Sequence, residues 1–289
     1  MRIGIAVKPK LVEARETLAD VSAWLRRRGV DAVWTTEAAE LVDGADRKVA
    51  EREQLPAQVD VVLVLGGDGT LLAMAKAIAE SGRDIPILAV NFGSLGFLTE
   101  ITRPEIHSSL EAVLNGRATH DLRMMLRATA TRQGRAPLSH MALNDVVFTR
   151  TALSRMIELS VSVGDQFVTT VKADGLIVAT PTGSTAYNLA AGGPIVHPSM
   201  DALVLTPIAP HMLTNRPIVI PTEREVRVRS TSSNAGDEVY VTVDGQTGFG
   251  LHEGDEIAIA KSERPLRLIR STTRSYFEVL RQKLKWNER

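Results

Sequence analysis

Residues 61–76 constrain the fold of this chain more than any other stretch. Five consecutive Val and Leu residues, 61–65, predict a strand that is buried on both faces, and helix-forming residues follow Thr70. Between them lies Gly-Gly-Asp-Gly-Thr, where glycine permits positive φ angles and lets the backbone approach a ligand closely. The stretch therefore predicts a strand, a tight turn and a helix whose free N–H groups favour anions, with Thr70 as its cap.

One carboxylate, Asp68, stands in this turn at the carboxyl end of the predicted strand, where open α/β sheets bind ligands. A lone carboxylate among phosphate-binding groups repels phosphate, unless it holds a metal or accepts a proton from an attacking hydroxyl. The turn therefore favours phosphoryl transfer. A purely structural Gly-rich turn is the alternative, since the sequence has neither a Walker A pattern nor Gly-x-Gly-x-x-Gly.

Composition narrows the class of partner. The 34 basic and 34 acidic side chains cancel, which argues against nucleic acid or a membrane and favours a small molecule. There is no cysteine, so disulfides, thiolate metal sites and cysteine nucleophiles are excluded, as suits a reducing cytoplasm. The N-terminal apolar run is too short for a signal peptide, and no run of about 18 apolar residues predicts a transmembrane helix. We therefore expect a cytoplasmic protein.

The order of segments predicts two domains in the 289 residues. Strands alternate with helices up to about residue 120, which is typical of βαβ units around a parallel sheet: strands at 3–7, 31–34, 61–65 and 85–90, helices at about 13–28 and 70–81. Residues 38–56 are charged and weakly periodic, and we expect a solvated connection or flap there.

Beyond residue 120 the hydrophobic period changes from 3.6 to 2. Apolar and polar residues alternate at 157–163, 226–228, 239–243 and 257–259, which predicts half-buried antiparallel strands. The fold class expected is thus an α/β domain over 1–120 and a mostly-β domain over 121–270. Residues 271–289 contain an amphipathic helix that would pack back on the first domain.

Two further turns are suited to binding. Residues 91–97 form a glycine-containing turn after the strand predicted at 85–90, so they should line the same crevice as Asp68. In the second domain, a buried strand at 176–179 leads into Thr-Pro-Thr-Gly-Ser-Thr and a short helix closed by Gly192. Hydroxyl and backbone donors there suit an anion or a ribose, although a structural Thr/Ser-rich turn is the alternative. One such turn in each domain predicts a ligand with several phosphates held between them.

These motifs together resemble the bacterial NAD kinases over nearly the whole chain. Gly-Gly-Asp-Gly is shared with diacylglycerol kinases, sphingosine kinases and phosphofructokinases, whereas Thr-Pro-Thr-Gly-Ser-Thr-Ala-Tyr is far more specific. The other matching stretches are Asn144-Asp145, Gly-Gly-Pro-Ile-Val-His-Pro at 192–198 and Ala-Pro-His-Met-Leu-Thr-Asn-Arg-Pro-Ile at 209–218. The resemblance implies a Rossmann-like, phosphofructokinase-like first domain.

The resemblance also implies an activity. A phosphoryl group would pass from ATP, or from polyphosphate, to the 2′-hydroxyl of the adenosine ribose of NAD, giving NADP. A divalent cation, Mg²⁺ or Mn²⁺, would assist, and the protein would be a homotetramer or homodimer. Two alternatives stay open: a related kinase acting on a lipid or sugar, and an NAD sensor without catalysis. The neutral charge disfavours a lipid kinase, and a sensor has no need of Asp68.

Roles for single residues follow from the same resemblance. Asp68 matches the proton acceptor, with metal binding through water as a second role. The residues implied in substrate binding are Gly69 and Phe92 on the adenine side, Asn144 and Asp145 at the nicotinamide ribose, Asp174 near the nicotinamide, Thr185, Ala186, Tyr187, Asn188, Leu189 and Ala190 around the adenine and the nicotinamide amide, and Gln246.

The chain departs from the family pattern at three positions. Many relatives carry Asn-Glu where this chain has Asn144-Asp145. Lys172 stands where relatives often have Arg, and we expect it to pair with Asp174 and shape the pocket, the alternative being a solvated charge. Arg155 falls where relatives place a side chain that reaches a neighbouring subunit's ligand, and here the alternative is a surface cation.

Overall fold

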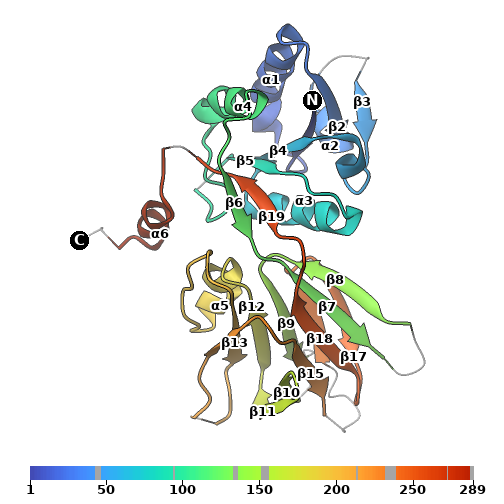
Figure 1. Cartoon of the computed structure of the whole chain (residues 1–289), viewed down its shortest axis with the longest axis vertical. Coiled ribbons are helices and arrows are strands. Elements are labelled where there is room, and N and C mark those ends of the chain that lie inside the picture. Colours follow the sequence, from blue (N-terminus) through green and yellow to red (C-terminus); the bar gives the residue numbers. More distant parts are fainter. Residues whose placement is uncertain are drawn as a thin grey trace. The chain divides into compact units, whose positions relative to one another are not determined.

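A computed structural model describes residues 1–42, 47–93, 95–132, 136–150, 156–212, 214–231, 239–271 and 273–286. The chain divides into two compact units, which are described separately (Figure 1). The first unit combines Met1–Leu122 with Leu266–Arg289, and the second is Arg123–Pro265. The first unit is therefore built from both ends of the chain.

The first unit contains a seven-stranded sheet in the order β3-β2-β1-β4-β5-β19-β6. The pairs from β3 through β19 are parallel, as the alternation of strands and helices predicts. All six residues of β4 are buried, which confirms the strand buried on both faces. The strands are β1 Arg2–Val7, β2 Asp31–Thr35, β3 Lys48–Ala50, β4 Val61–Gly66, β5 Ile87–Asn91, β6 His120–Arg123 and β19 Leu266–Ile269.

The helices of this unit place their apolar side chains in its core. Leu18, Val21 and Leu25 of α1 are buried in the same cluster as Ile3 and Ile5 of β1. The helices are α1 Arg15–Arg27, α2 Thr36–Ala39, α3 Asp68–Ser81, α4 Ile106–Leu114 and α6 Tyr276–Leu284, with 3₁₀ turns at Val12–Ala14, Leu55–Gln58 and Arg103–Glu105. None of the helices in the described residues combines the length and apolar character that crossing a bilayer requires.

The expected flap at residues 38–56 is wrong for the part that the structure describes. Strand β3 extends the sheet by pairing with β2, and Ala38 and Leu55 are fully buried. Leu55 packs against the backbone of β1, where a Cβ on Gly4 would lie 3.1 Å from the Leu55 side chain. The prediction failed because short elements with one or two buried residues each leave no periodic signal among charged neighbours.

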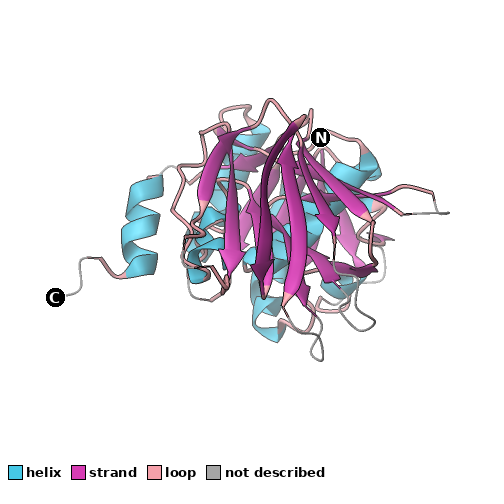
Figure 2. Cartoon of the chain, turned by 90° about the horizontal axis from the view of Figure 1, so that it is seen from below, coloured by secondary structure: helices cyan, strands magenta, loops and turns pink. Residues whose placement is uncertain are grey.

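The second unit is built almost entirely of strands, which are magenta in Figure 2. They form two six-stranded sheets, in the orders β11-β10-β15-β18-β7-β8 and β14-β13-β12-β9-β16-β17. The strands are β7 Leu126–Thr131, β8 Leu138–Ala142, β9 Asp145–Arg150, β10 Ile157–Val163, β11 Gln166–Ala173, β12 Gly175–Ala179, β13 Ala202–Ile208, β14 Ile218–Pro221, β15 Val226–Ser230, β16 Val239–Val243, β17 Thr247–Leu251 and β18 Glu256–Lys261.

The strand pairings among the described residues of this unit are all antiparallel, which confirms the prediction from the alternating residues. Side chains from both sheets form one core, including Phe148 of β9 and Leu159 of β10. Strand β12 is also covered on its other face, where Ile177 and Ala179 pack with Val196. The hydroxyl-rich turn and its short helix, α5 Tyr187–Ala190, are therefore attached to a rigid central strand.

Candidate active site

The glycine turn of the first unit begins helix α3 directly at Asp68. Gly67 is the N-cap and offers no side-chain cap, so Thr70 lies in the first turn and is not the cap that was predicted. A Cβ on Gly66 would lie only 2.6 Å from the hydroxyl oxygen of Thr70. Glycine at position 66 therefore allows the helix to start immediately after β4.

The carboxylate of Asp68 is held by the turn that follows β5. Its Oδ1 accepts hydrogen bonds from Leu98 N, Thr99 N and Thr99 Oγ1 at 3.2, 3.1 and 2.9 Å, and Oδ2 accepts one from Phe97 N at 2.9 Å. The predicted approach of this turn to Asp68 is confirmed. It depends on Gly96, because a Cβ there would lie 2.1 Å from Asp68 Oδ1.

The two carboxylate oxygens of Asp68 are therefore not equivalent. A carboxylate has about four acceptor sites, two on each oxygen. Three donors crowd Oδ1, whereas among the described residues one donor binds Oδ2. Oδ2 thus keeps acceptor capacity for a hydroxyl or for a metal-bound water, while Oδ1 anchors the side chain.

Thr99 and Asn91 fix this arrangement, although neither was predicted as a site residue. The Thr99 hydroxyl donates to Asp68 and accepts from Asn91 Nδ2 at 3.0 Å, and Asn91 Oδ1 accepts from Gly93 N at 2.7 Å. Thr99 is fully buried. The available signal was the position of Asn91 at the end of a predicted strand beside Gly-containing turns.

In the second unit, Asp244 organises the segment that leads into β9. Its carboxylate accepts hydrogen bonds from the backbone N–H groups of Leu143, Asn144 and Asp145 at 2.8, 2.7 and 3.0 Å. The sequence interpretation missed Asp244. A signal existed, because Asp-Gly between alternating strands is typical of a tight hairpin turn, and both Asp244 and Gly245 have positive φ, +50° and +64°.

Asp145 has an unusual electrostatic environment. Its residue surface is only 4% exposed. Burial, together with the nearby Asp244 carboxylate, raises the pKa of Asp145 to about 7. Asn144, the preceding residue, is half-buried, and its carbonyl accepts a hydrogen bond from Thr180 N. The predicted Asn-Asp pair therefore lies against the hydroxyl-rich turn.

The hydroxyl-rich turn uses most of its hydroxyls internally. Thr180 Oγ1 donates to Leu143 O at 2.6 Å, and Ser184 Oγ donates to Pro181 O at 2.6 Å. The prediction that these hydroxyls serve a ligand is wrong for Thr180 and Ser184, since each donor is already engaged. Thr180 holds the turn against residues 143–144, where a Cβ on Gly183 would lie 2.1 Å from Asn144 O. Ser184 links the turn to Val196, whose N–H donates to the Ser184 hydroxyl.

Asn188 was predicted to contact substrate, but its side chain faces the protein interior. Its Nδ2 donates to Ser184 O and to Pro194 O at 3.0 Å, and its Oδ1 accepts from Thr206 Oγ1 at 2.6 Å. Asn188 is also fully buried, so its side-chain amide has a structural role. Its neighbours are more accessible: Tyr187 and Ala190 are exposed, and Thr185, Ala186 and Leu189 are half-buried.

The expected pairing of Lys172 with Asp174 is also wrong. Lys172 Nζ pairs with Glu158 Oε2 at 3.0 Å across the β10–β11 ladder, whereas Asp174 Oδ1 pairs with Arg150 Nε at 2.9 Å. Strand β11 ends at Ala173, so Asp174 does not share the face of Lys172. Arg150 is the partner that sequence reasoning missed.

The remaining predicted residues lie as follows. Gly69 is exposed in the first turn of α3, and Gln246 is exposed in the β16–β17 turn. Phe92 is half-buried, with the guanidinium carbon of Arg103 located 5.4 Å from its ring centre. Arg155 lies outside the described residues.

A divalent cation would find few protein ligands here. Within the described residues, no three His, Cys, Asp or Glu side chains come together as a metal site. Magnesium is commonly held by one or two carboxylates together with substrate phosphates and waters. The open acceptor site on Asp68 Oδ2 fits that mode of binding, so a cation would arrive with the phosphates.

Comparisons with known proteins identify one family. Residues 3–118 match the model of the ATP-NAD kinase N-terminal domain, and residues 143–271 match that of the ATP-NAD kinase C-terminal domain. The chain is 48% identical to the NAD kinase of Syntrophotalea carbinolica over 288 residues, covering 100% of this chain and 99% of that protein. It is 46% identical to the NAD kinase of Geotalea daltonii over 281 residues, covering 97% and 96%.

Comparison with solved structures identifies the same family. Yeast NADH kinase complexed with NADH matches with a TM-score of 0.91 and 26% identity, covering 100% of this chain and 89% of that one. An NAD kinase from Archaeoglobus fulgidus in complex with ATP matches with a TM-score of 0.75 and 26% identity, covering 98% and 99%. The resemblance and the fold class inferred from the motifs are both confirmed, and the chain belongs to the NAD kinase family.

Proposed function

We propose that this NAD kinase transfers the terminal phosphoryl group of ATP to the 2′-hydroxyl of the adenosine ribose of NAD, with Asp68 as the proton acceptor. The observation that carries the proposal is the asymmetry of the Asp68 carboxylate, in which Oδ1 is anchored and Oδ2 retains acceptor capacity. A ribose hydroxyl is a weak nucleophile until a base within hydrogen-bond reach takes its proton.

The 2′-oxygen of NAD forms a bond to the γ-phosphorus, the bond from that phosphorus to the bridging oxygen breaks, and ADP leaves. The hydroxyl proton passes to Asp68 Oδ2. Thr99 and Asn91 keep the carboxylate in position during this transfer, because their hydrogen bonds restrict its rotation.

A divalent cation, Mg²⁺ or Mn²⁺, is part of the proposal. When bound with the phosphates it would neutralise charge that develops on them. Asp68 Oδ2 is the atom of this chain that could bind it through a water, as the alternative to accepting the hydroxyl proton, because Phe97 N already occupies one acceptor site of Oδ2.

Substrate binding is assigned to the predicted residues that stay accessible. In the first unit these are Gly69 and Phe92. In the second unit they are Asn144, Asp174, Thr185, Ala186, Tyr187, Leu189, Ala190 and Gln246. Asp145 is buried, and it is added on the family resemblance alone. The exposure of Tyr187, 45%, supports its role as a surface on which a base or nicotinamide ring could stack. We further propose a cytoplasmic homotetramer or homodimer, which rests on the family resemblance, and light scattering of the purified protein would test the assembly.

The test is an assay of NADP formation with ATP, other nucleoside triphosphates and polyphosphate as donors, and with NAD and NADH as acceptors. We expect turnover with ATP, a divalent cation and NAD. The Tyr187→Ala variant should raise the KM for NAD more than the KM for ATP, since it removes the stacking surface. NAD binding without turnover would instead identify a sensor, and equal changes in both KM values would place Tyr187 outside the site.

A further inference from the structure

A second feature of the first unit lies beside the glycine turn and shares only Asn91 with the groups that hold Asp68. It is a pocket of about 730 Å³. Its lining includes Lys8, Glu13, Asn91, Phe92, Arg103 and Arg274. Three of these residues, Lys8, Arg103 and Arg274, are cations from segments far apart in the sequence.

The position of the pocket is the one that sheet topology favours for ligands. Within the sheet, β2 lies next to β1 on one side, whereas β4 and then β5 lie on the other side of β1. The direction of winding therefore reverses between β1 and β4, and open α/β sheets bind ligands at the carboxyl ends of the strands at such a point. Lys8 directly follows β1, and Phe92 directly follows β5 and donates its N–H to Gly66 O at the end of β4.

Lys8 and Arg103 are available to an anion. Among the described residues, no carboxylate forms an ion pair with either side chain, and both residues are exposed. The Arg103 guanidinium lies over the ring of Phe92, 5.4 Å from its centre, which keeps it at the pocket. Lys8 lies against the glycine turn, because its Cβ is 3.2 Å from where a Cβ on Gly66 would lie.

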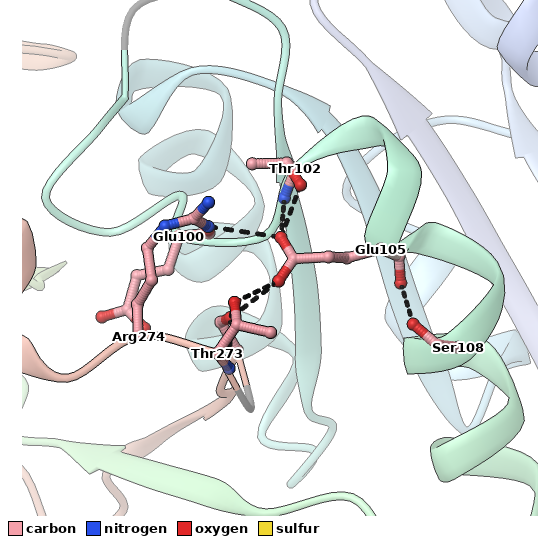
Figure 3. A network of polar contacts seen from close by, with 7 residues as sticks. Glu100, Thr102, Glu105, Ser108, Thr273 and Arg274 are labelled. Carbon is pink, nitrogen blue, oxygen red and sulfur yellow. Dashed lines mark hydrogen bonds and ion pairs between the residues drawn. The ribbon is translucent and has the colours of Figure 1, made fainter.

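Arg274 is held in place by a separate network, shown in Figure 3. Its Nη1 donates to Glu100 O at 3.0 Å and contacts Glu105 Oε2 at 3.3 Å. Glu105 in turn accepts hydrogen bonds from Thr102 and Thr273. Both bonds of Arg274 use one nitrogen, so the guanidinium retains N–H donors on its other nitrogens for a ligand at a fixed position.

We propose that this pocket binds the condensed-phosphate chain of the phosphoryl donor, with Lys8, Arg103 and Arg274 as its ligands. Arginine suits bidentate contact with phosphate oxygens, and lysine supplies a compact charge next to them. Glu13 and Glu105 offset part of the positive charge, which leaves a site for a polyanion rather than for a neutral group. A triphosphate carries more charge than the pyrophosphate of NAD, and three cations suit the larger charge.

The inference rests on the proposed function for the identity of the donor, but a probe without a nucleoside tests the pocket itself. Binding of inorganic tripolyphosphate to the full-length protein is measured by calorimetry at low and high salt. Lys8→Gln and Arg103→Gln are compared with Arg103→Lys, which keeps the charge, and with Arg27→Gln, an exposed cation near the end of α1, as the matched control. Kinetic constants for ATP and NAD are measured on the same variants, and circular dichroism verifies folding.

Each Gln variant should weaken tripolyphosphate binding and raise the KM for ATP by about tenfold, because each removes one charged contact with phosphate. The KM for NAD should stay within about twofold in those variants. Arg103→Lys should recover part of the loss, and Arg27→Gln should behave as wild type.

The inference would be overturned if the wild type did not bind tripolyphosphate measurably, or if both Gln variants bound it as tightly as the wild type. It would also be overturned if the variants raised the KM for NAD alone. That third result would assign the pocket to the NAD pyrophosphate. Failure of the proposed function looks different. A wild type that binds tripolyphosphate, loses it in the Gln variants and still forms no NADP would uphold the pocket and refute the kinase activity.

Discussion

Asp68 of the first unit and Asp145 of the second are both carboxylates at the start of a regular element, yet their surroundings are opposite. Asp68 receives four hydrogen bonds from the turn after β5. Asp145 is buried near Asp244, and the three backbone N–H groups of its own segment are taken by that neighbour. One site surrounds a negative charge with donors, and the other places a second negative charge beside it.

This difference shows how one residue type can serve two purposes. Oδ2 of Asp68 is an acceptor in a pre-arranged frame, which suits a proton acceptor. Burial raises the pKa of Asp145 to about 7, so near neutral pH a fraction of the molecules carries a protonated carboxyl there. A protonated carboxyl can donate a hydrogen bond, which an ionised one cannot.

The strongest way to break the comparison is to replace each carboxylate by its amide. Asp68→Asn should lower kcat by about 10²–10⁴, because it removes the general base, while NAD binding should change by less than about tenfold. Asp145→Asn should leave kcat within about tenfold, since the amide resembles the protonated carboxyl in shape. Steady-state kinetics and NAD titration of both variants measure these effects. Near-normal turnover in Asp68→Asn would refute the role of Asp68 as the base.

The second prediction concerns pH. The pKa of Asp145 rises from 3.8 unfolded to about 7 folded, so between these values the folded protein binds the extra proton and the unfolded chain does not. Stability should therefore fall as pH rises from about 4 to 7, by up to roughly 4 kcal/mol at 1.36 kcal/mol per pH unit.

Thermal unfolding of wild type and Asp145→Asn across this range measures the effect, and the variant should lack that part of the pH dependence. Carboxyl NMR provides the direct check. An apparent pKa near 4 for Asp145 in the folded protein would contradict the assignment.

Glu105 extends the comparison, because it is an acid of the first unit whose pKa is lowered, whereas the pKa of Asp145 is raised. Burial alone would raise its pKa, but hydrogen bonds from Thr102, Thr273 and Ser271 outweigh burial and lower the pKa to about 2. Its stabilising contribution is therefore complete above pH 4.5 and is lost as pH falls towards 2. Glu105→Gln should lower the free energy of unfolding by about 2 kcal/mol at pH 7.

Urea unfolding, followed by the tryptophan residues of the first unit, measures the Glu105→Gln change. Glu111→Gln in helix α4 is the matched control, since Glu111 forms a solvent-exposed ion pair with Arg28. Equal losses in the two variants would mean that the network around Glu105 contributes no more than one surface pair.

The smallest expected effect separates the two cations near Asp174. Lys172→Ala should change stability by less than about 1 kcal/mol and leave the preference for NAD over NADH unchanged, because Lys172 pairs with Glu158 at the surface. Arg150→Ala removes the observed partner of Asp174 and should alter that preference. Ratios of kcat/KM for NAD and NADH test both, and a shifted ratio in Lys172→Ala would restore the strut that the sequence suggested.

Long periodic or apolar runs made most of the fold predictable. The run at β4 and the alternation at β10 each carry a signal over five or more residues, whereas β3 has three residues and a single buried side chain. The site was predictable where a motif contains the functional atom, as at Asp68. At Asp244 the sequence indicates the hairpin turn but not the bonds to residues 143–145, and at Arg150 it does not indicate the pairing with Asp174, because these contacts exist only after strands pair.

The prediction that the hydroxyls of residues 180–185 bind a ligand failed for a related reason. A hydroxyl in a turn can bind a ligand or the protein backbone, and local sequence does not distinguish the two outcomes. In the structure, Thr180 and Ser184 bind backbone carbonyls, and Asn188 binds two more. What these residues contribute to function is the rigidity of the turn on which the accessible Tyr187 is carried.

The place of β19 in the first sheet affects how this protein is made. During synthesis on a ribosome, β1 to β6 emerge long before residues 266–269, yet β19 lies between β5 and β6. Until residues 266–269 have emerged, β5 therefore has an unpaired edge that could join a strand of another nascent chain. All strands of the second unit have emerged by then. The unit that contains the first strand, β1, is thus the last one whose sheet can close.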